Sequence, residues 1–225
     1  MFRPAIRAST RSGLPDADAS MNSMRRYYVD KFFRANAPSL TGLVLDIGGR
    51  RWSRRGAFSP LSYSFKTVCL DLTPSCDVQA EGEHLPFRDE VFAAVLCSEV
   101  VEHVADPFRL LKEAHRVLIP RGRLLLCAPF LYPIHNDPSD YLRFTDQFWA
   151  LHLPLLGFDV ERIESHGAFF SVCADIFRSC VMRWNRIPRR LVSSTLVLWL
   201  QSLALRKESF MPEYTTGFGV VAVKQ

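Results

Sequence analysis

Three continuous apolar runs, each ending near a polar residue, constrain the fold of this chain most strongly. They are LVLDI (43–47), KTVCLDL (66–72) and FAAVLCS (92–98). Runs without polar alternation predict strands buried on both faces, as in parallel sheets that helices cover on both sides. The segment DPFRLLKEAHRVL predicts one such helix, because Asp106 can cap it, Pro107 suits its first turn and its apolar positions share one face. The sequence therefore predicts an α/β fold.

The rest of the chain adds elements of both kinds. Helices are predicted in MRRYYVDKFFRANAPSL and in TDQFWALHLPLLGF, the second capped by Thr145, and strands in RLLLCAP, FDVERIES and GFGVVAVK. Residues 166–215 predict two further helices separated by Pro188. We expect a disordered or flexible tail over residues 1–23 and a single domain over residues 24–225, in which residues 166–215 form a helical insert.

Composition and charge exclude several classes of protein. Of the 225 residues, 48% are hydrophobic, which is typical of a soluble globular protein. The net charge of +5 is too small to make nucleic acid the expected partner. The cysteines lie in apolar stretches, without a CxxC motif or metal-ligand spacing, so we expect free thiols in a reducing compartment and no metal site. No apolar run reaches the roughly 20 residues of a membrane-spanning helix, and we expect a cytoplasmic protein.

Acidic residues and glycines follow the first two predicted strands. Asp46, Gly48 and Gly49 close the first strand, and Asp71 closes the second. Ligands of parallel sheets bind at the carboxyl ends of strands, where a carboxylate can accept hydrogen bonds from both ribose hydroxyls. Glycine lets the backbone approach such a ligand closely. The pattern predicts a nucleoside site; a tight turn with a capping acid and no ligand is the alternative.

The residues after Gly49 distinguish between nucleoside cofactors. A dinucleotide fingerprint that began at Gly48 would have glycines two and five residues later, but Arg50 and Ser53 stand there. The usual cradle for a pyrophosphate is therefore absent from the sequence. S-adenosylmethionine contains a nucleoside and no pyrophosphate, so it does not need that cradle.

The segment from about Val44 to Pro129 resembles the class I S-adenosylmethionine-dependent methyltransferases, in the branch of the ubiquinone- and menaquinone-type and small-molecule enzymes. The resemblance is carried by VLDIGG, VCLDL, LPFRDEVF, the EH after FAAVLCS, and RVLIPRG before RLLLCAP. It implies a Rossmann-like fold with a mostly parallel seven-stranded sheet, an antiparallel last strand and helices on both faces. It also implies S-adenosylmethionine as the cofactor.

By this resemblance the cofactor pocket contains residues from four places in the chain. Asp46, Gly48 and Gly49 shape the methionine side, and Asp71 holds the ribose. Glu81 meets the adenine amino group, at a position where the family usually has aspartate. Ser98 and Glu99 match the loop that passes under the sulfonium. The adjoining residues Leu72 and Gly82 are assigned to the same pocket.

The segment APFLYPIHNDPSDYLRFT is similar to methyltransferases of bacterial polysaccharide and secondary-metabolite pathways, and it lies where an acceptor would bind. Methyl transfer to a hydroxyl requires removal of a proton, and imidazole is a suitable base near neutral pH. His135 is therefore the expected catalytic base, with Asp137 or Asp140 orienting it, and His103 is the competing candidate.

Tyr141 and Arg143 are expected to contact the acceptor. The alternative is a stabilising loop in which Arg143 pairs with an acid and Tyr141 packs. His103 has the simpler alternative of a hydrogen bond within its own loop.

Two basic segments are candidates for further contacts. The first segment contains Arg50, Arg51, Arg54 and Arg55. It forms either a solvated face or a site for a phosphate on the substrate, and Arg54 and Arg55 are the main candidates for that phosphate contact. Residues 183–207 combine tryptophans and an apolar helix with flanking arginines. The preferred interpretation is an insert that packs its apolar face over the active site or against a second subunit, and peripheral membrane contact is the alternative. The sequence does not predict the oligomeric state.

The sequence thus predicts an S-adenosylmethionine-dependent methyltransferase that acts on a hydroxyl of a sugar, a glycolipid or a related small molecule, with a free or lipid-linked acceptor as its partner. One alternative is a binding protein that kept the fold and lost methyl transfer, since arginine stands in the glycine turn. Another is a C-methyltransferase of a quinone-like lipid, with which the hydrophobic insert is compatible.

Overall fold

The computed structural model describes residues 23–49, 56, 58–136, 138–183 and 189–225, with backbone alone at residues 61, 182–183 and 189–195. Seven strands form one sheet in the order β3-β2-β1-β4-β5-β7-β6. The strands are β1 Leu43–Ile47, β2 Lys66–Asp71, β3 Val78–Gln79, β4 Phe92–Ser98, β5 Leu118–Pro129, β6 Phe158–Ser165 and β7 Gly217–Lys224. Neighbouring strands are parallel except for β7, which runs antiparallel to β5 and β6. The predicted mostly parallel sheet with an antiparallel last strand is confirmed.

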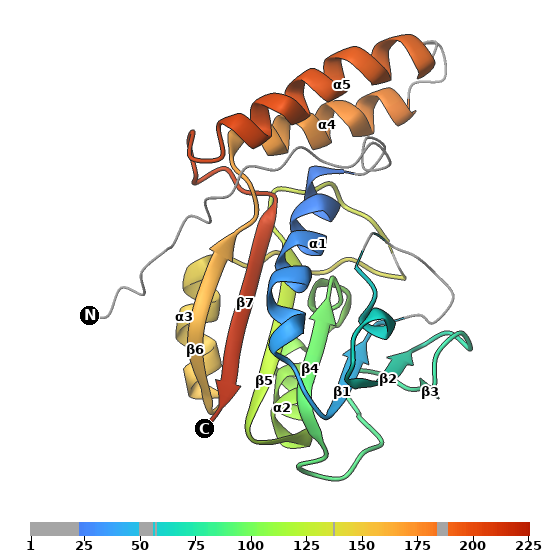
Figure 1. Cartoon of the computed structure of the whole chain (residues 1–225), viewed down its shortest axis with the longest axis vertical. Helices are drawn as coiled ribbons and strands as arrows, with labels where there is room; N and C mark the ends of the chain where they lie inside the picture. The colour runs from blue at the N-terminus through green and yellow to red at the C-terminus, as the bar shows by residue number, and fades with distance from the viewer. Residues whose placement is uncertain (1–22, 50–55, 57, 137, 184–188) are drawn as a thin grey trace.

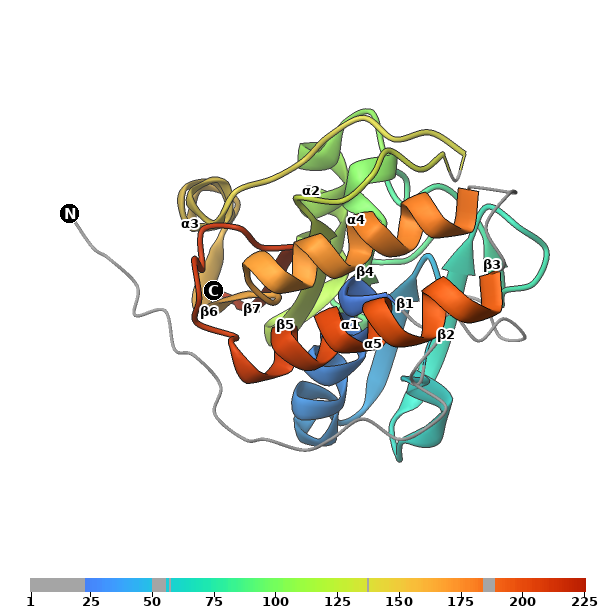
Figure 2. The same cartoon turned by 90° about the horizontal axis from the view of Figure 1, so that it is seen from above.

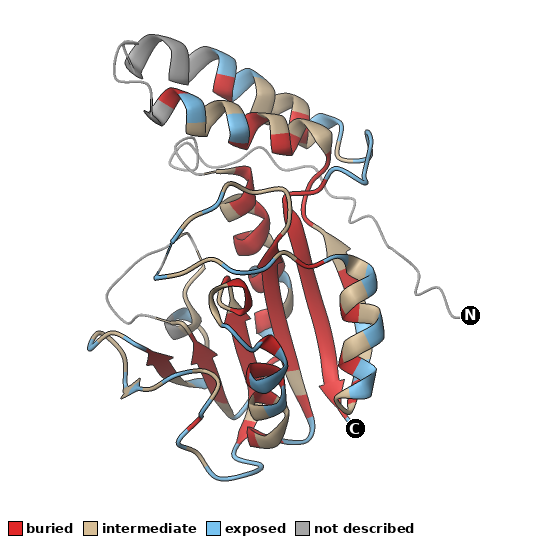
Figure 3. Cartoon of the chain, turned by 180° about the vertical axis from the view of Figure 1, so that it is seen from behind, coloured by how far each residue is buried: buried red, intermediate tan, exposed pale blue. Residues whose placement is uncertain are grey.

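Helices cover both faces of this sheet (Figure 1). Helix α1 (Met24–Asn36) packs on one face, and α2 (Pro107–Val117) and α3 (Asp146–Leu155) pack on the other. Successive side chains of a strand point to opposite faces. Val44 accordingly belongs to the cluster around α1, whereas Leu45 belongs to the larger cluster under α2 and α3. Seen from behind, the strands are buried and the outer sides of α2 and α3 are exposed (Figure 3).

Side-chain caps begin the helices at the predicted places. The Asp106 side chain accepts a hydrogen bond from the Arg109 backbone N–H at 3.0 Å, and Thr145 accepts one from Phe148 at 3.3 Å. These bonds satisfy N–H groups that have no partner within the helix. Because such caps depend only on residues two or three positions apart, local sequence was enough to predict them.

Two parts of the sheet differ from the prediction. β5 begins at Leu118, so Pro120 and Gly122 lie inside the strand rather than in a loop before it. The pairing of β4 with β5 shifts register between Phe92 and Ala94, and Arg121 has a positive φ of 64°, as expected where a strand accommodates extra residues. β3 was not predicted, because its two residues are defined only by their pairing with β2.

Two helices, α4 (Phe169–Arg183) and α5 (Arg189–Arg206), lie between β6 and β7, within residues 166–215. The arrows of β1 and β4 point toward this hairpin, and the view from above shows α4 and α5 lying across the molecule side by side (Figures 1 and 2). Met24 and Tyr28 of α1 pack against Ala174 and Ala204 of the hairpin. The α4–α5 hairpin therefore covers the edge of the sheet at which the parallel strands end. Among the described helices, none is long and apolar enough to cross a membrane.

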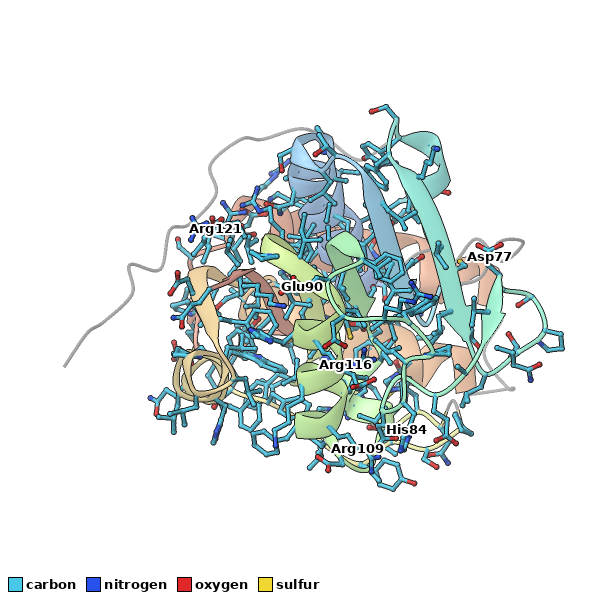
Figure 4. The ribbon with its side chains drawn as sticks, turned by 90° about the horizontal axis from the view of Figure 1, so that it is seen from below. Asp77, His84, Glu90, Arg109, Arg116 and Arg121 are labelled. Carbon is cyan, nitrogen blue, oxygen red and sulfur yellow. The ribbon has the colours of Figure 1, made fainter. Side chains whose placement is uncertain are left out.

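Arg116 organises the segment LPFRDEVF at the opposite edge (Figure 4). Its guanidinium donates hydrogen bonds to the carbonyls of Leu85 and Phe87 and to the carboxylates of Asp89 and Glu113, at 2.7 to 3.0 Å. One side chain of α2 thus holds the connection that leads into β4. These contacts give the segment LPFRDEVF a structural role, because Arg116 fixes its backbone and its Asp89 side chain.

Candidate active site

A cavity of about 340 Å³ opens at the carboxyl ends of the parallel strands. Its volume is in the range of small-molecule and cofactor sites. Six of the nine predicted cofactor residues line it: Gly48, Asp71, Leu72, Glu81, Gly82 and Glu99. His103, from the predicted catalytic set, lines it as well. The other three, Asp46, Gly49 and Ser98, are not part of the lining that the described residues form.

The turn after β1 requires glycine at two positions. Gly48 has a φ of +76°, and a Cβ at this position would lie 2.3 Å from Cγ2 of Val100. A Cβ on Gly49 would lie 2.1 Å from Oδ2 of Asp46, which is a buried side chain. Gly48 also donates its backbone N–H to the carbonyl of Leu70 at 2.7 Å. The two glycines and Asp46 therefore form a close-packed turn that brings backbone to the floor of the cavity.

Asp71 and Glu81, the two acids predicted to contact the nucleoside, both lie on the cavity wall. Asp71 is buried at the end of β2, and its Oδ1 accepts a hydrogen bond from the Thr73 backbone N–H at 2.8 Å. Glu81 is largely exposed, and its carboxylate lies 3.6 Å from Nδ1 of His84. With apolar groups such as Ile47 and Leu70 beside them, these acids fit a ligand that carries hydroxyls and an aromatic base.

Glu99 lies at the inner end of the cavity, bound by Arg25 of α1. The Arg25 guanidinium donates to both carboxylate oxygens of Glu99, with the Nε bond at 3.1 Å, and its Nη1 donates to Nδ1 of His166 at 2.7 Å. Burial by itself would raise the pKa of Glu99, but the charge and hydrogen bonds of Arg25 outweigh it and hold that pKa below its usual value. Burial, followed by the charge of Arg25, lowers the pKa of His166 well below its usual value, so this imidazole is a neutral acceptor.

Glu102 is fully buried beside this pair. Among the described residues, neither of its carboxylate oxygens has a hydrogen-bond partner. Burial and then the negative charge of Glu99 raise the pKa of Glu102 well above its usual range. A carboxylate without a partner is costly in such surroundings, so this side chain requires a proton or another cation.

The two predicted candidate bases lie together. The rings of His103 and His135 meet edge to face with their centroids 4.9 Å apart. His103 lines the cofactor cavity and also a second cavity of about 220 Å³, which His135 lines from the far side. Glu99 is likewise common to both cavities. The second cavity therefore adjoins the first at the residues predicted to face the transferred methyl group.

Asp140 fixes the loop that carries His135. Its Oδ2 accepts hydrogen bonds from the His135 backbone N–H at 2.9 Å and from Arg143 Nη2 at 2.7 Å, and lies 3.4 Å from His135 Nδ1. The hydrogen bonds from Arg143 are the main cause of a low pKa of Asp140, which is about 2. Asp140 is therefore an orienting group rather than a base. Arg143 pairs with an acid, as in the alternative interpretation of this loop, whereas Tyr141 exposes 57% of its surface.

Several predicted contact residues lie outside the part of the chain that the structure describes. They are Arg50, Arg51, Arg54, Arg55 and Asp137. Their roles stay predictions.

Sequence reasoning missed Arg25, Glu102 and Val100 as members of the site. The side-chain partners of Arg25 lie 74 and 141 positions away in the chain. By its sequence alone Glu102 could be a solvated loop acid, but it is buried. No local pattern marks a long-range partner, although the EH pair Glu102-His103 did mark the right segment.

A comparison of the sequence with models of protein families tests the predicted resemblance. Residues 60–126 match a family model described as a methyltransferase domain. The chain carries a class I methyltransferase domain. The matched segment contains Asp71, Glu81 and Glu99, and hence most of the cavity wall. The predicted membership of the class I S-adenosylmethionine-dependent methyltransferases is thus confirmed.

The sequence relatives include named methyltransferases. The chain is 31% identical over 157 residues to the ubiquinone/menaquinone biosynthesis C-methyltransferase UbiE of Bartonella tribocorum, covering 69% of this chain and 49% of that protein. It is also 31% identical over 128 residues to an uncharacterized protein of Methanocaldococcus jannaschii, covering 53% of this chain and 52% of the relative. The chain thus spans about half the length of these two curated relatives.

Solved structures share the fold at low identity. An S-adenosylmethionine-dependent methyltransferase from Archaeoglobus fulgidus matches with a TM-score of 0.54 at 17% identity, over 89% of this chain and 94% of that one. The [4+2]-cyclase SpnF matches with a TM-score of 0.56 at 16% identity, over 88% and 80% of the two chains. Because enzymes named for different reactions share this fold, it does not determine the acceptor. The family model, the relatives and the fit of the cavity support S-adenosylmethionine as the cofactor.

Proposed function

We propose that this protein transfers a methyl group from S-adenosylmethionine to a hydroxyl of a sugar, a glycolipid or a related small molecule. The observation that carries the proposal is the second cavity, which meets the cofactor cavity at Glu99 and His103. An acceptor in this second cavity would lie next to the cofactor, within reach of two imidazoles. Such proximity supplies much of the rate enhancement in a direct displacement.

The chemistry requires a bond between the acceptor oxygen and the methyl carbon as the carbon–sulfur bond breaks, with the electron pair left on sulfur. S-adenosylmethionine supplies the methyl group, and its products are S-adenosylhomocysteine and a methyl ether. The hydroxyl proton must also leave. His103 and His135 are the groups of this chain that promote its loss, while Asp140 holds the main chain of His135 and Arg25 holds Glu99.

The lining of the second cavity favours a polar acceptor. It consists of Ser23, Arg25, Arg26, Glu99, His103, Tyr132 and His135. Charged and hydroxyl-bearing side chains can form hydrogen bonds with a polyhydroxylated acceptor, whereas a quinone-like lipid ring would bury them without partners. The likeness to UbiE, a protein named as a C-methyltransferase, favours the quinone-like acceptor as the second candidate.

Calorimetry with S-adenosylmethionine and S-adenosylhomocysteine tests the cofactor half of the proposal. We expect both to bind; a protein that binds neither would support the non-catalytic alternative and defeat the enzyme interpretation.

Transfer of a labelled methyl group to a panel of nucleotide sugars, glycolipids and quinols then tests the acceptor half. We expect labelled methyl ethers from the hydroxylated acceptors, with a loss of transfer in His135→Ala and none in His152→Ala, because His152 lies on α3. Labelling of the quinol carbon alone would establish the second candidate instead.

Peripheral membrane contact through residues 183–207 stays a prediction. Leu198 and Trp199 of α5 are exposed, with 42% and 58% of their surfaces accessible. Flotation with liposomes, comparing the wild type with Trp199→Ser, tests it: unchanged flotation of the variant would remove Trp199 from any such contact.

A further inference from the structure

Three side chains of metal-ligand type gather between the two cavities. Glu102, His103 and His135 each offer one ligand atom, and these atoms lie within 4.8 Å of one another. Glu102 and His103 come from the 3₁₀ turn Val101–His103 after β4, and His135 comes from the loop after β5. The tertiary structure thus assembles two imidazoles and a carboxylate at one point.

Neither carboxylate oxygen of Glu102 has a hydrogen-bond partner among the described residues. Its side chain is 0% exposed, and Oε1 lies 3.6 Å from Nε2 of His103. The arginines that face it already serve other acids, because Arg25 binds Glu99 with two nitrogens and Arg143 binds Asp140 with two. Neither arginine therefore donates a hydrogen bond to Glu102. A cation that replaces the proton of this side chain would give its carboxylate the partner that it lacks.

The imidazoles are oriented as ligands. Nδ1 of His103 forms a hydrogen bond with the carbonyl oxygen of Ser139, and Nδ1 of His135 forms one with the carbonyl of Pro133 at 3.2 Å. A carbonyl oxygen only accepts, so each Nδ1 carries the proton and each Nε2 keeps its lone pair. Fixing the second ring nitrogen in this way is what outer partners of metal-binding histidines do.

We propose that Glu102, His103 and His135 bind a divalent transition-metal ion, such as Zn²⁺, beside the cofactor cavity. Two imidazoles and one carboxylate form a known ligand set for such ions, and they leave a position open for an oxygen ligand. Ligand bonds of about 2.0–2.1 Å put tetrahedral ligand atoms about 3.3 Å apart. The distances between the ligand atoms therefore shrink by up to about 1.5 Å when the ion binds.

The role of this ion rests on the proposed function, whereas its binding does not. In the open position the ion would hold the acceptor hydroxyl and lower its pKa, so that its proton passes to solvent water; the alkoxide then attacks the methyl carbon as the carbon–sulfur bond breaks, with the electron pair left on sulfur. The two histidines then promote proton loss as ligands of the ion rather than as free bases. Sequence spacing did not predict the site, because the third ligand comes 32 residues after His103 and from a different strand end.

Metal binding to the full chain, freed of metal with a chelator, tests the proposal directly. We expect Zn²⁺ to bind by calorimetry with one ion per chain, and Co²⁺ to develop the visible absorption of a site with nitrogen ligands. Glu102→Gln, which keeps the size of the side chain, is expected to weaken Zn²⁺ binding by at least about 100-fold, and His135→Ala similarly. His152→Ala is the matched control and should bind Zn²⁺ as the wild type does.

Two results would overturn the inference: no binding of Zn²⁺ or Co²⁺ to the wild type, or equal binding by wild type and His135→Ala. Binding of S-adenosylhomocysteine by the wild type, measured in the same preparations, separates this inference from the proposed function. If the wild type does not bind S-adenosylhomocysteine, the proposed function alone is wrong. If it does not bind the metal, the metal site alone is wrong.

Discussion

Asp175 of α4 predicts an unusual dependence of stability on pH. Its carboxylate accepts hydrogen bonds from the backbone N–H groups of Met24 at 2.6 Å and Arg25 at 2.8 Å, and so joins the α4–α5 hairpin to the start of α1. The side chain is buried, and burial raises its pKa from 3.8 to about 6, against the opposing effects of those N–H groups and of Arg178 and Arg25.

The sign and size of the effect follow from linkage. Since the folded state binds this proton more tightly than the unfolded state, the contribution of Asp175 to stability is present below about pH 4 and is lost as the pH rises through about 6. A shift of about two pKa units corresponds to about 3 kcal/mol, at 1.36 kcal/mol per unit. Asp175→Asn cannot titrate. The free energy of unfolding of the wild type, relative to this variant, should therefore fall by about 2.4 kcal/mol between pH 4 and pH 7.5.

Urea denaturation of both proteins at several pH values measures this difference, and the other titrating groups cancel in the comparison. Ser179→Ala is the matched control: it removes the hydrogen bond from Ser179 to the Asp175 carbonyl at 2.8 Å but no charge, so its difference from the wild type should not change with pH. A wild type that gains stability over Asp175→Asn as the pH rises would refute the reasoning. It would mean that the two backbone N–H groups outweigh burial.

Three further substitutions test the site and the core. Gly48→Ala should weaken binding of S-adenosylhomocysteine in calorimetry by at least about 10-fold, because the new Cβ meets Val100. The double variant with Val100→Ala should recover only part of the lost affinity, because the left-handed backbone at residue 48 still costs about 1–2 kcal/mol. Asp71→Ala should also weaken binding by at least about 10-fold, since a hydrogen bond to a charged group contributes about 1.5–3 kcal/mol; unchanged affinity would exclude the ribose contact. Trp149→Ala should lower the free energy of unfolding by about 3–5 kcal/mol in urea, because this side chain is fully buried, whereas the exposed Leu151→Ala should change it by under about 0.5 kcal/mol.

Much of the fold could be predicted because its signals are local. The buried strands are continuous apolar runs, and the caps Asp106 and Thr145 act on N–H groups three residues away. The turn Gly48-Gly49 could be located for the same reason. β3 could not be predicted, since two residues carry no pattern and depend on a partner strand.

The residues that line the candidate cavity could be predicted from the sequence, but the contacts among the buried charged side chains beside it could not. Gly48, Asp71 and Glu99 stand directly at strand ends, where the parallel sheet brings them together whatever the rest of the chain does. Asp140 was expected to assist a base, and its paired contacts with Arg143 and with the main chain of His135 became visible only in three dimensions.

The sequence by itself therefore determined the class of fold and the edge of the sheet at which the cavity opens, because periodicity, turns and strand ends are encoded within a few residues. Its family resemblance indicated the cofactor. The tertiary structure alone decided which charges are compensated. Arg25 reaches Glu99 across 74 positions, and the buried carboxylate of Glu102 has no hydrogen-bond partner among the described residues. Burial and long-range pairing change the cost of a charge by several kcal/mol, and neither can be read from neighbours in sequence.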